Sequence, residues 1–403
     1  MRTSNQSASS RPARAALWAL VLSAAIPAWA GEPPAGSLAA GNTAFALKLY
    51  SELRATEGNL FFSPFSISSA LGMTYAGARG NTATEMKSAL HYPLEPADLP
   101  AAFQRLDREL VANARKAGQE LAIANGLCLT GGNVSDGFKS LLEDNFDAEL
   151  FAGGLDRING WVKRKTEGKI AKILDQLDPN SVCVLLNAIY FKGTWASPFP
   201  KAATRDGPFQ MAAGRQVVVP FMHRKTALPI LRQPDFQATA IPYQGDRLSM
   251  VILLPDKVDG LGALEKQLTG GNLGQWLAGL DRAASGEVDL WLPKFKLETG
   301  CDLVAPCKAL GINDAFDATG KADFTGMGWK QGELWISQIK HKAYVEVNEE
   351  GTEAAAATAV EMATRAAPQV SVFRADHPFL FLIRDHESGS ILFLGRLAAP
   401  AGK

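Results

Sequence analysis

The chain has few of the side chains, and none of the short motifs, from which common catalytic centres are built. It has 403 residues but only five histidines and four cysteines. No His-Glu-x-x-His, Cys-x-x-Cys or Gly-x-Ser-x-Gly motif occurs, and no phosphate-cradling glycine loop. Its carboxylates are scattered. The sequence therefore predicts neither an enzyme nor a site for a metal or cofactor.

Charge of one sign and long hydrophobic runs are also scarce. Lys plus Arg and Asp plus Glu number 41 each, and no dense basic segment provides a local field for nucleic acid. The composition, 47% hydrophobic and 20% charged, is that of a globular protein with a large core. Because no Ser-, Pro- or Gly-rich linker divides the interior, we predict a single domain over residues 42–403.

The N-terminus is the exception, because it resembles a leader. Basic residues precede an apolar run at 15–26, which is short for a membrane span, and Ala28-x-Ala30 fits a signal-peptidase site. We predict a signal peptide over residues 1–30 and a flexible segment over 31–41. The mature protein is expected to be periplasmic or secreted, with no membrane attachment after cleavage.

Four cysteines are too few for a disulfide scaffold in a chain of this length. Cys301 and Cys307 fall in one predicted helix, too far apart along its axis to bond. Cys128 and Cys183 fall in two strand-like runs that could be neighbours. We expect buried free thiols, and the sequence leaves a bridge between Cys128 and Cys183 open.

Hydrophobic periodicity predicts helices first and strands later along the chain. Helices are predicted over 42–57, from Pro64 after an N-cap at Ser63, and over 81–92, 98–118, 158–170 and 303–310. Strands are predicted over 121–129, 182–191, 238–243, 248–254, 288–297, 335–347, 379–383 and 391–394. This order indicates an α+β fold with large mixed sheets.

One stretch, residues 349–368, fits neither state. Its alanines favour a helix, yet it lies between two predicted strands and has almost no bulky apolar residue. At a period of two, one face carries only small or apolar residues: Thr352, Ala354, Ala356, Thr358, Val360 and Met362. Glu353 and Glu361 share the other face. The pattern is that of an exposed loop that could become a strand buried on one side.

Several long motifs resemble those of the serpin family, and they occur in the family's order from about residue 42 to 400. They are Asn59–Ser66, Gly77–Met86, Leu186–Trp195, Ala322–Gly326, His341–Glu353 and Ala375–Phe381. The resemblance implies one domain with three β-sheets, eight or nine helices and an exposed reactive-centre loop at about 349–373. It also implies a protease inhibitor rather than an enzyme.

In inhibitory serpins, a target protease attacks this loop and forms an acyl-enzyme with the residue before the scissile bond. The cut loop then enters the largest sheet as a new strand and carries the protease to the opposite pole, where its catalytic site is distorted. The resemblance assigns the loop hinge to Glu349, Gly351, Thr352, Glu353, Ala354, Ala355, Ala356 and Ala357.

The composition of the loop favours an inhibitory serpin. Gly351 can supply the backbone freedom of a hinge, and the inward-facing positions from Thr352 to Met362 carry no charge or proline. Non-inhibitory members typically have bulky, charged or proline residues there. The alternative is a non-inhibitory serpin that acts as a binding or chaperone-like protein, whose loop is only cut.

The family's spacing places the scissile residue fourteen positions after the hinge glycine, at Arg365. A trypsin-like protease presents a buried carboxylate that suits a guanidinium group. We therefore predict Arg365–Ala366 as the reactive bond and a trypsin-like serine protease as the partner, with a cysteine protease also open. The alternatives are Thr364–Arg365, and Met362–Ala363 for an elastase- or chymotrypsin-like target.

The resemblance also assigns structural roles. Four residues match a buried polar cluster beneath the part of the main sheet that opens: Ser63, Ser66, Asn187 and His341. Three match the point where the loop first enters the sheet: Trp195, Lys294 and Glu349. We expect an ion pair between Lys294 and Glu349, and core positions for Phe379 and the terminal hairpin.

Two features depart from the commonest members of the family. Between Phe151 and Ile158 the chain is several residues shorter than usual for the helix that crosses the main sheet. The helix predicted at 98–118 mixes acidic with basic residues, so activation by heparin is not expected. We expect a metastable monomer.

Overall fold

The fold is described from a computed structural model that covers residues 37–179, 181–211, 214–350 and 370–402 together with Met1. These ranges contain nine α-helices: α1 (Leu38–Leu53), α2 (Pro64–Gly77), α3 (Gly80–Ala89), α4 (Leu99–Lys116), α5 (Asp136–Phe146), α6 (Leu155–Lys165), α7 (Leu261–Gln267), α8 (Gly270–Arg282) and α9 (Val304–Ala309). In these ranges, no helix is both long and apolar enough to span a membrane.

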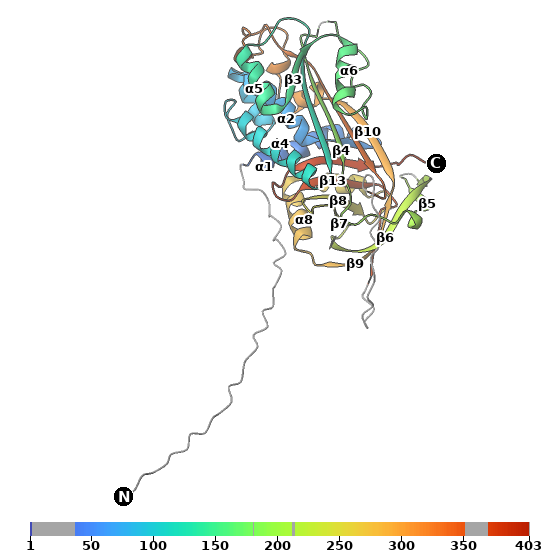
Figure 1. Cartoon of the computed structure of the whole chain (residues 1–403). Helices are drawn as coiled ribbons and strands as arrows, with labels where there is room; N and C mark the ends of the chain where they lie inside the picture. Colours follow the sequence, from blue (N-terminus) through green and yellow to red (C-terminus); the bar gives the residue numbers. More distant parts are fainter. Residues whose placement is uncertain (2–36, 180, 212–213, 351–369, 403) are drawn as a thin grey trace.

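Five strands form a mixed sheet that carries the candidate site. Their order is β10 (Phe295–Asp302), β11 (Ile336–Val347), β4 (Cys183–Lys192), β2 (Glu120–Leu129) and β3 (Ala148–Ala152). β11 and β4 run parallel, and so do β2 and β3, whereas the other neighbours are antiparallel. Figure 1 shows these long strands side by side in the upper half of the molecule.

The remaining nine strands form two sheets that share one strand. The shared strand is β6 (Gln216–Arg232), which pairs with β7 (Phe236–Pro242) only at its last three residues. One sheet continues through β8 (Leu248–Pro255), β13 (Phe379–Asp385), β14 (Ile391–Leu397) and β1 (Leu60–Phe62). The other contains β5 (Arg205–Gln210), β9 (Ser285–Pro293) and β12 (Ser371–Arg374). The α+β class with three sheets is confirmed.

The motif Asn59–Ser66 contains β1 and the start of α2, and the predicted helix cap is present. Ser63 is the N-cap of α2, where its Oγ accepts a hydrogen bond from the backbone N–H of Ser66 at 3.1 Å, and Pro64 occupies the first turn. The first helix, however, begins at Leu38 rather than residue 42. Ser37 caps it by accepting from the N–H of Ala40, a signal that the periodicity alone did not reveal.

The strand predicted over 288–297 is wrong, because the chain changes sheets within it. β9 ends at Pro293 after pairing with β6, and β10 begins at Phe295 and pairs with β11. Proline has no N–H for a further ladder bond, which favours a break at this point. Lys294 therefore lies between two sheets, and its N–H donates to the carbonyl of Pro220 at 2.9 Å.

The predictions for the cysteines are confirmed in part and wrong in part. Cys301 is not helical: it continues β10 opposite His341, and the helix containing Cys307 starts only at Val304. Cys128 and Cys183 lie on the adjacent strands β2 and β4, but their side chains join hydrophobic clusters on opposite faces of the sheet. All four cysteines are free thiols. A bridge between Cys128 and Cys183 would have to cross the sheet.

The five-stranded sheet is covered on both faces (Figure 1). α2, every residue of which is buried, packs on the inner face together with the main core. α6 packs on the outer face, where Ile158, Trp161 and Val162 join residues of β2, β4 and β11 in a separate cluster. α6 has only eleven residues and follows β3 after Gly153 and Gly154, consistent with the short segment before Ile158.

Trp161 fixes α6 on the sheet because β2 carries a glycine beneath it. A Cβ atom added to Gly126 would lie 2.8 Å from Cζ2 of Trp161, closer than a carbon contact allows. Trp161 is 1% exposed, so the ring has no route to solvent without moving the helix. Gly126 is therefore required for close approach of the helix to the sheet.

We predict that Gly126→Ala lowers the free energy of unfolding by about 1–3 kcal/mol, because overpacking displaces Trp161. Gly160→Ala is the matched control: it lies in α6 beside Trp161, and an added Cβ there meets nothing within 4 Å. That variant should be neutral or stabilising. Thermal unfolding of both variants at one scan rate checks the prediction, and equal midpoints would contradict it.

Candidate functional site

The candidate site is built around the boundary between β11 and β4, which we call the seam. The two strands are parallel and pair from Ile336 opposite Cys183 to Val345 opposite Phe191. β11 ends at Val347, close to the point where β4 also ends. The chain that follows β11 therefore leaves the sheet at the end of the seam.

Polar side chains cross the seam on its inner face. His341 of β11, Asn187 of β4 and Asn125 of β2 are register partners on three successive strands. His341 Nδ1 lies 2.6 Å from Asn187 Oδ1, and Asn187 Nδ2 donates to Asn125 Oδ1 at 2.8 Å. All three side chains are buried.

α2 completes this row from below. The backbone N–H of Ser63 donates to His341 Nε2 at 3.1 Å, and Asn187 Nδ2 donates to Ser66 Oγ at 2.6 Å. Ser63, Ser66, Asn187 and His341 are thus brought together as the sequence predicted. Asn125 and Ser69, which the sequence analysis missed, extend the network through a 3.4 Å hydrogen bond. An isolated Asn or Ser gives no local signal of such a role.

The partners of His341 determine its protonation state. Because Nε2 accepts from a backbone N–H, the ring proton lies on Nδ1 and is donated to Asn187. Burial lowers the pKa of His341 to about 3. The imidazole is therefore neutral at physiological pH, and the seam is held by hydrogen bonds without a formal charge.

An aromatic pair crosses the seam on its outer face. Tyr190 of β4 and Tyr344 of β11 are register partners, with ring centroids 5.7 Å apart in an edge arrangement. Both are buried in the cluster beneath α6. Parting β4 from β11 must therefore break contacts on both faces of the sheet.

The end of the seam is fixed by Glu349, which is 6% exposed. Lys294 Nζ lies 2.7 Å from its Oε2, and Thr204 Oγ1 donates to its Oε1 at 2.8 Å. Burial alone would raise the pKa of the Glu349 carboxyl, but the hydrogen bonds from Lys294 and Thr204 outweigh burial and lower it. The expected Lys294–Glu349 contact is present, and Thr204 is a partner that the sequence analysis missed.

Hydrogen bonds to its backbone carbonyls hold the same segment. The indole Nε1 of Trp195 donates to the carbonyl of Asn348 at 2.9 Å, and the backbone N–H of Trp195 donates to the carbonyl of Glu350 at 3.1 Å. The N–H of Phe199 donates to the carbonyl of Glu349 at 2.8 Å. Trp195, Lys294 and Glu349 therefore lie together at the end of the seam.

The hinge from Gly351 to Ala357 and the bond between Arg365 and Ala366 lie outside the described residues. The structure resumes at Val370, and β12 follows in a different sheet from β11. Within the described ranges, no group of His, Cys, Asp and Glu side chains could hold a metal ion.

The family model for Serpin (serine protease inhibitor) matches residues 40–400. The chain belongs to the serpin family. Among curated relatives, this serpin is 42% identical over 386 residues to the leukocyte elastase inhibitor of Sus scrofa, an alignment that covers 90% of this chain and 99% of the relative. It is 39% identical over 379 residues to serpin B8 of Homo sapiens, with the same coverages of 90% and 99%.

Solved serpin structures share the fold. The native state of the thermophilic serpin tengpin matches with a TM-score of 0.79 and 30% identity, over 89% of this chain and 93% of that chain. Human thyroxine-binding globulin matches with a TM-score of 0.81 and 29% identity, over 90% and 98%. The family and the fold that the motifs implied are confirmed, and the family's activity is protease inhibition rather than catalysis.

We predict that His341→Gln flattens the dependence of stability on pH. Below about pH 6.5 the unfolded histidine binds a proton that the native one does not, so the free energy of unfolding falls as pH drops towards 3. The limiting slope is about 1.4 kcal/mol per pH unit. Glutamine can keep the hydrogen bonds but cannot titrate. Thermal midpoints between pH 7.5 and 4.5 check this.

His386 is the internal control for that experiment. Burial and then the neighbouring Arg384 also lower its pKa to about 3, so it contributes a slope of the same sign in both proteins. The difference between wild type and variant isolates His341. Superimposable pH profiles would show that His341 does not contribute.

We predict an energetic coupling of about 1 kcal/mol between Lys294 and Glu349, since the lysine side chain is 35% exposed and solvent weakens the pair. The double-mutant cycle uses Lys294→Met, Glu349→Gln and the combination at pH 7. Lys330→Met and Glu333→Gln, an exposed pair elsewhere, form the matched control cycle with almost no coupling. A Lys294–Glu349 value as low as the control would disprove the pair's contribution.

Proposed function

We propose that this serpin is an exported, irreversible inhibitor of trypsin-like serine proteases, which it traps through its reactive bond Arg365–Ala366. The observation that carries the proposal is the geometry of the seam. The chain leaves β11 after Val347, beside the end of β4, and the predicted hinge begins at Glu349.

The strand directions favour insertion at this seam. β11 and β4 are parallel, so a segment that turns back at Glu350 runs antiparallel to both. Insertion would replace one parallel ladder with two antiparallel ladders. The eleven positions from Thr352 to Met362 match the twelve residues of β11 in length. The receiving sheet is thus the five-stranded one, although the other strands form the larger network.

The loop chemistry supports an inhibitor rather than a substrate. The positions that would face the core are small or apolar, and Val360 and Met362 would each contribute very roughly 1.5–3 kcal/mol on burial. The energy released by a completed strand is available only after the loop is cut. The native protein is then a kinetically trapped state.

The target class and the location rest on single features. Arg365 favours a trypsin-like target, whereas the relatives named as leukocyte elastase inhibitors favour Met362–Ala363 and an elastase-like one. Export rests on the leader-like residues 1–30, which lie outside the residues matched to the family. The active form is a monomer in this proposal.

The deciding experiment mixes the mature protein with active trypsin and separates the products on a denaturing gel. We expect a band at the summed mass of the two proteins in the wild type and none in Arg365→Glu. Lys330→Glu, a charge reversal at an exposed residue away from the loop, is the control and should trap as the wild type does.

Two other outcomes are informative. If Arg365→Glu still traps its protease and Met362→Asp no longer traps pancreatic elastase, the reactive bond is Met362–Ala363. Complete cleavage with protease left active, and no rise in thermal midpoint of the cut protein, would replace the inhibitor with a binding protein. Thyroxine-binding globulin, a structural neighbour solved with thyroxine, is a family member with a bound ligand.

A further inference from the structure

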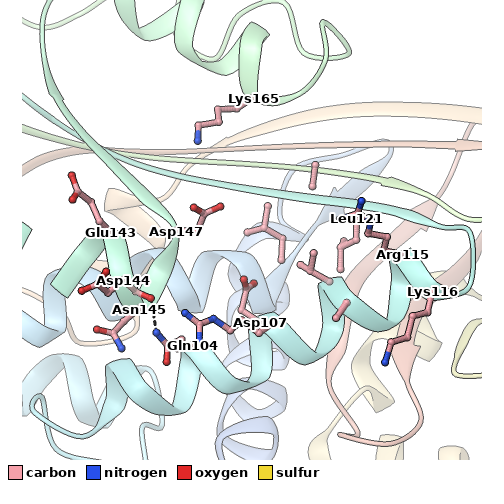
Figure 2. Close-up of a pocket in the computed structure, with 15 residues that line it drawn as sticks. Gln104, Asp107, Arg115, Lys116, Leu121, Glu143, Asp144, Asn145, Asp147 and Lys165 are labelled. Atoms are coloured by element: carbon pink, nitrogen blue, oxygen red, sulfur yellow. Dashed lines mark hydrogen bonds between the residues drawn. The ribbon is translucent and has the colours of Figure 1, made fainter. Parts of the chain in front are cut away.

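A cleft of about 880 Å³ lies away from the seam, between α4 and the start of β2 (Figure 2). The turn from α5 to β3 closes one end of it. The cleft follows one face of α4 from Gln104 to Lys116, a length of about 18 Å at the rise of an α-helix. Its volume suits a small organic ligand.

The middle of the cleft is apolar. Val111 and Ala112 of α4 face Leu121 and Ile123 of β2 across it. Val111 and Ile123 remain half-buried in the described protein, although they lie beside the main core. An apolar body placed between the helix and the strand would cover both side chains.

One end of the cleft is acidic. Asp107 projects from α4 into the space, with Asp147 of the α5–β3 turn across from it (Figure 2). Oδ1 of Asp107 is buried and has no hydrogen-bond partner among the described residues. Neither carboxylate forms an ion pair with any described side chain. Burial, and then the charge of Asp147, raise the pKa of Asp107 to about 6.

The basic residues of the cleft do not neutralise this end. Arg115 and Lys116 lie at the opposite end and are exposed (Figure 2). Lys165 contacts Glu149 at 3.8 Å, and Arg108 is exposed on the rim. A positive group bound at Asp107 would therefore meet two carboxylates without a competing cation between them.

We propose that the cleft binds an organic cation, with a primary ammonium group at Asp107 and an apolar body over the floor formed by α4 and β2. Charge complementarity selects the ammonium end, and the half-buried apolar residues select the body. A metal ion does not fit as well, because the described residues offer no third ligand of the usual kind.

The test uses three probes with the same apolar body: phenylbutylamine, phenylbutanol and phenylbutanoate. Binding to the full chain is followed by ligand-observed NMR at pH 7.5. We expect the amine to bind at least about fivefold more tightly than the alcohol, and the carboxylate not to bind. Equal affinity of amine and alcohol would overturn the proposal.

Two variants locate the site. Asp107→Asn should weaken amine binding to the level of the alcohol, and it removes an unpaired carboxylate, so it is expected to fold. Ala112→Trp should block the cleft and abolish binding of amine and alcohol alike. The control, Asp259→Asn, makes the same chemical change at an exposed loop position and should bind the amine unchanged. Retained amine affinity in Asp107→Asn would refute the assignment.

Discussion

The hydrogen bonds that His341 and Asn187 form with each other and with their neighbours are the constraint on which the rest of the site depends. They place a polar row inside a sheet whose surroundings are almost wholly apolar, and each buried group left without its partner would cost about 1–3 kcal/mol. α2 must therefore lie close enough for Ser63 and Ser66 to satisfy the remaining atoms. The row keeps the seam closed, yet its hydrogen bonds can be exchanged for others, which a seam of interlocked apolar side chains could not offer.

The crossover at Lys294 connects the seam to the rest of the molecule. Pro293 ends one sheet and Phe295 begins another, so the lysine between them is held by both ladders. Its ammonium group and the hydroxyl of Thr204 converge on one carboxylate, that of Glu349. A chain that changed sheets a few residues earlier would leave the buried Glu349 carboxylate without its cation. The position of the break in the strand is thus as important to the site as the residues themselves.

The sequence predicted the fold class, the α2 cap, the polar cluster at the seam and the residues at the end of the seam. The cap and the two groups of site residues lie in segments with strong local chemistry. Asn125 and Thr204 were not predictable in this way. Their roles arise from register and from tertiary approach, which leave no mark on neighbouring residues. Cys301 was predicted to be helical, but it belongs to β10. That strand extends to Asp302, which pairs with Lys340 of β11, and such a long-range contact leaves no mark in the local pattern. Local pattern thus identified most elements, and long-range pairing decided where they end.

The sheet assignments on either side of residues 351–369 have a further consequence. β11, before this segment, belongs to the five-stranded sheet, whereas β12, β13 and β14, after it, belong to the other two. Every residue of β13 and β14 is buried, between the antiparallel neighbours β8 and β1. A chain cut anywhere in the segment becomes a two-piece protein. Its smaller piece supplies central strands of the core, so breaking the backbone does not release it, and the two pieces remain one folded body.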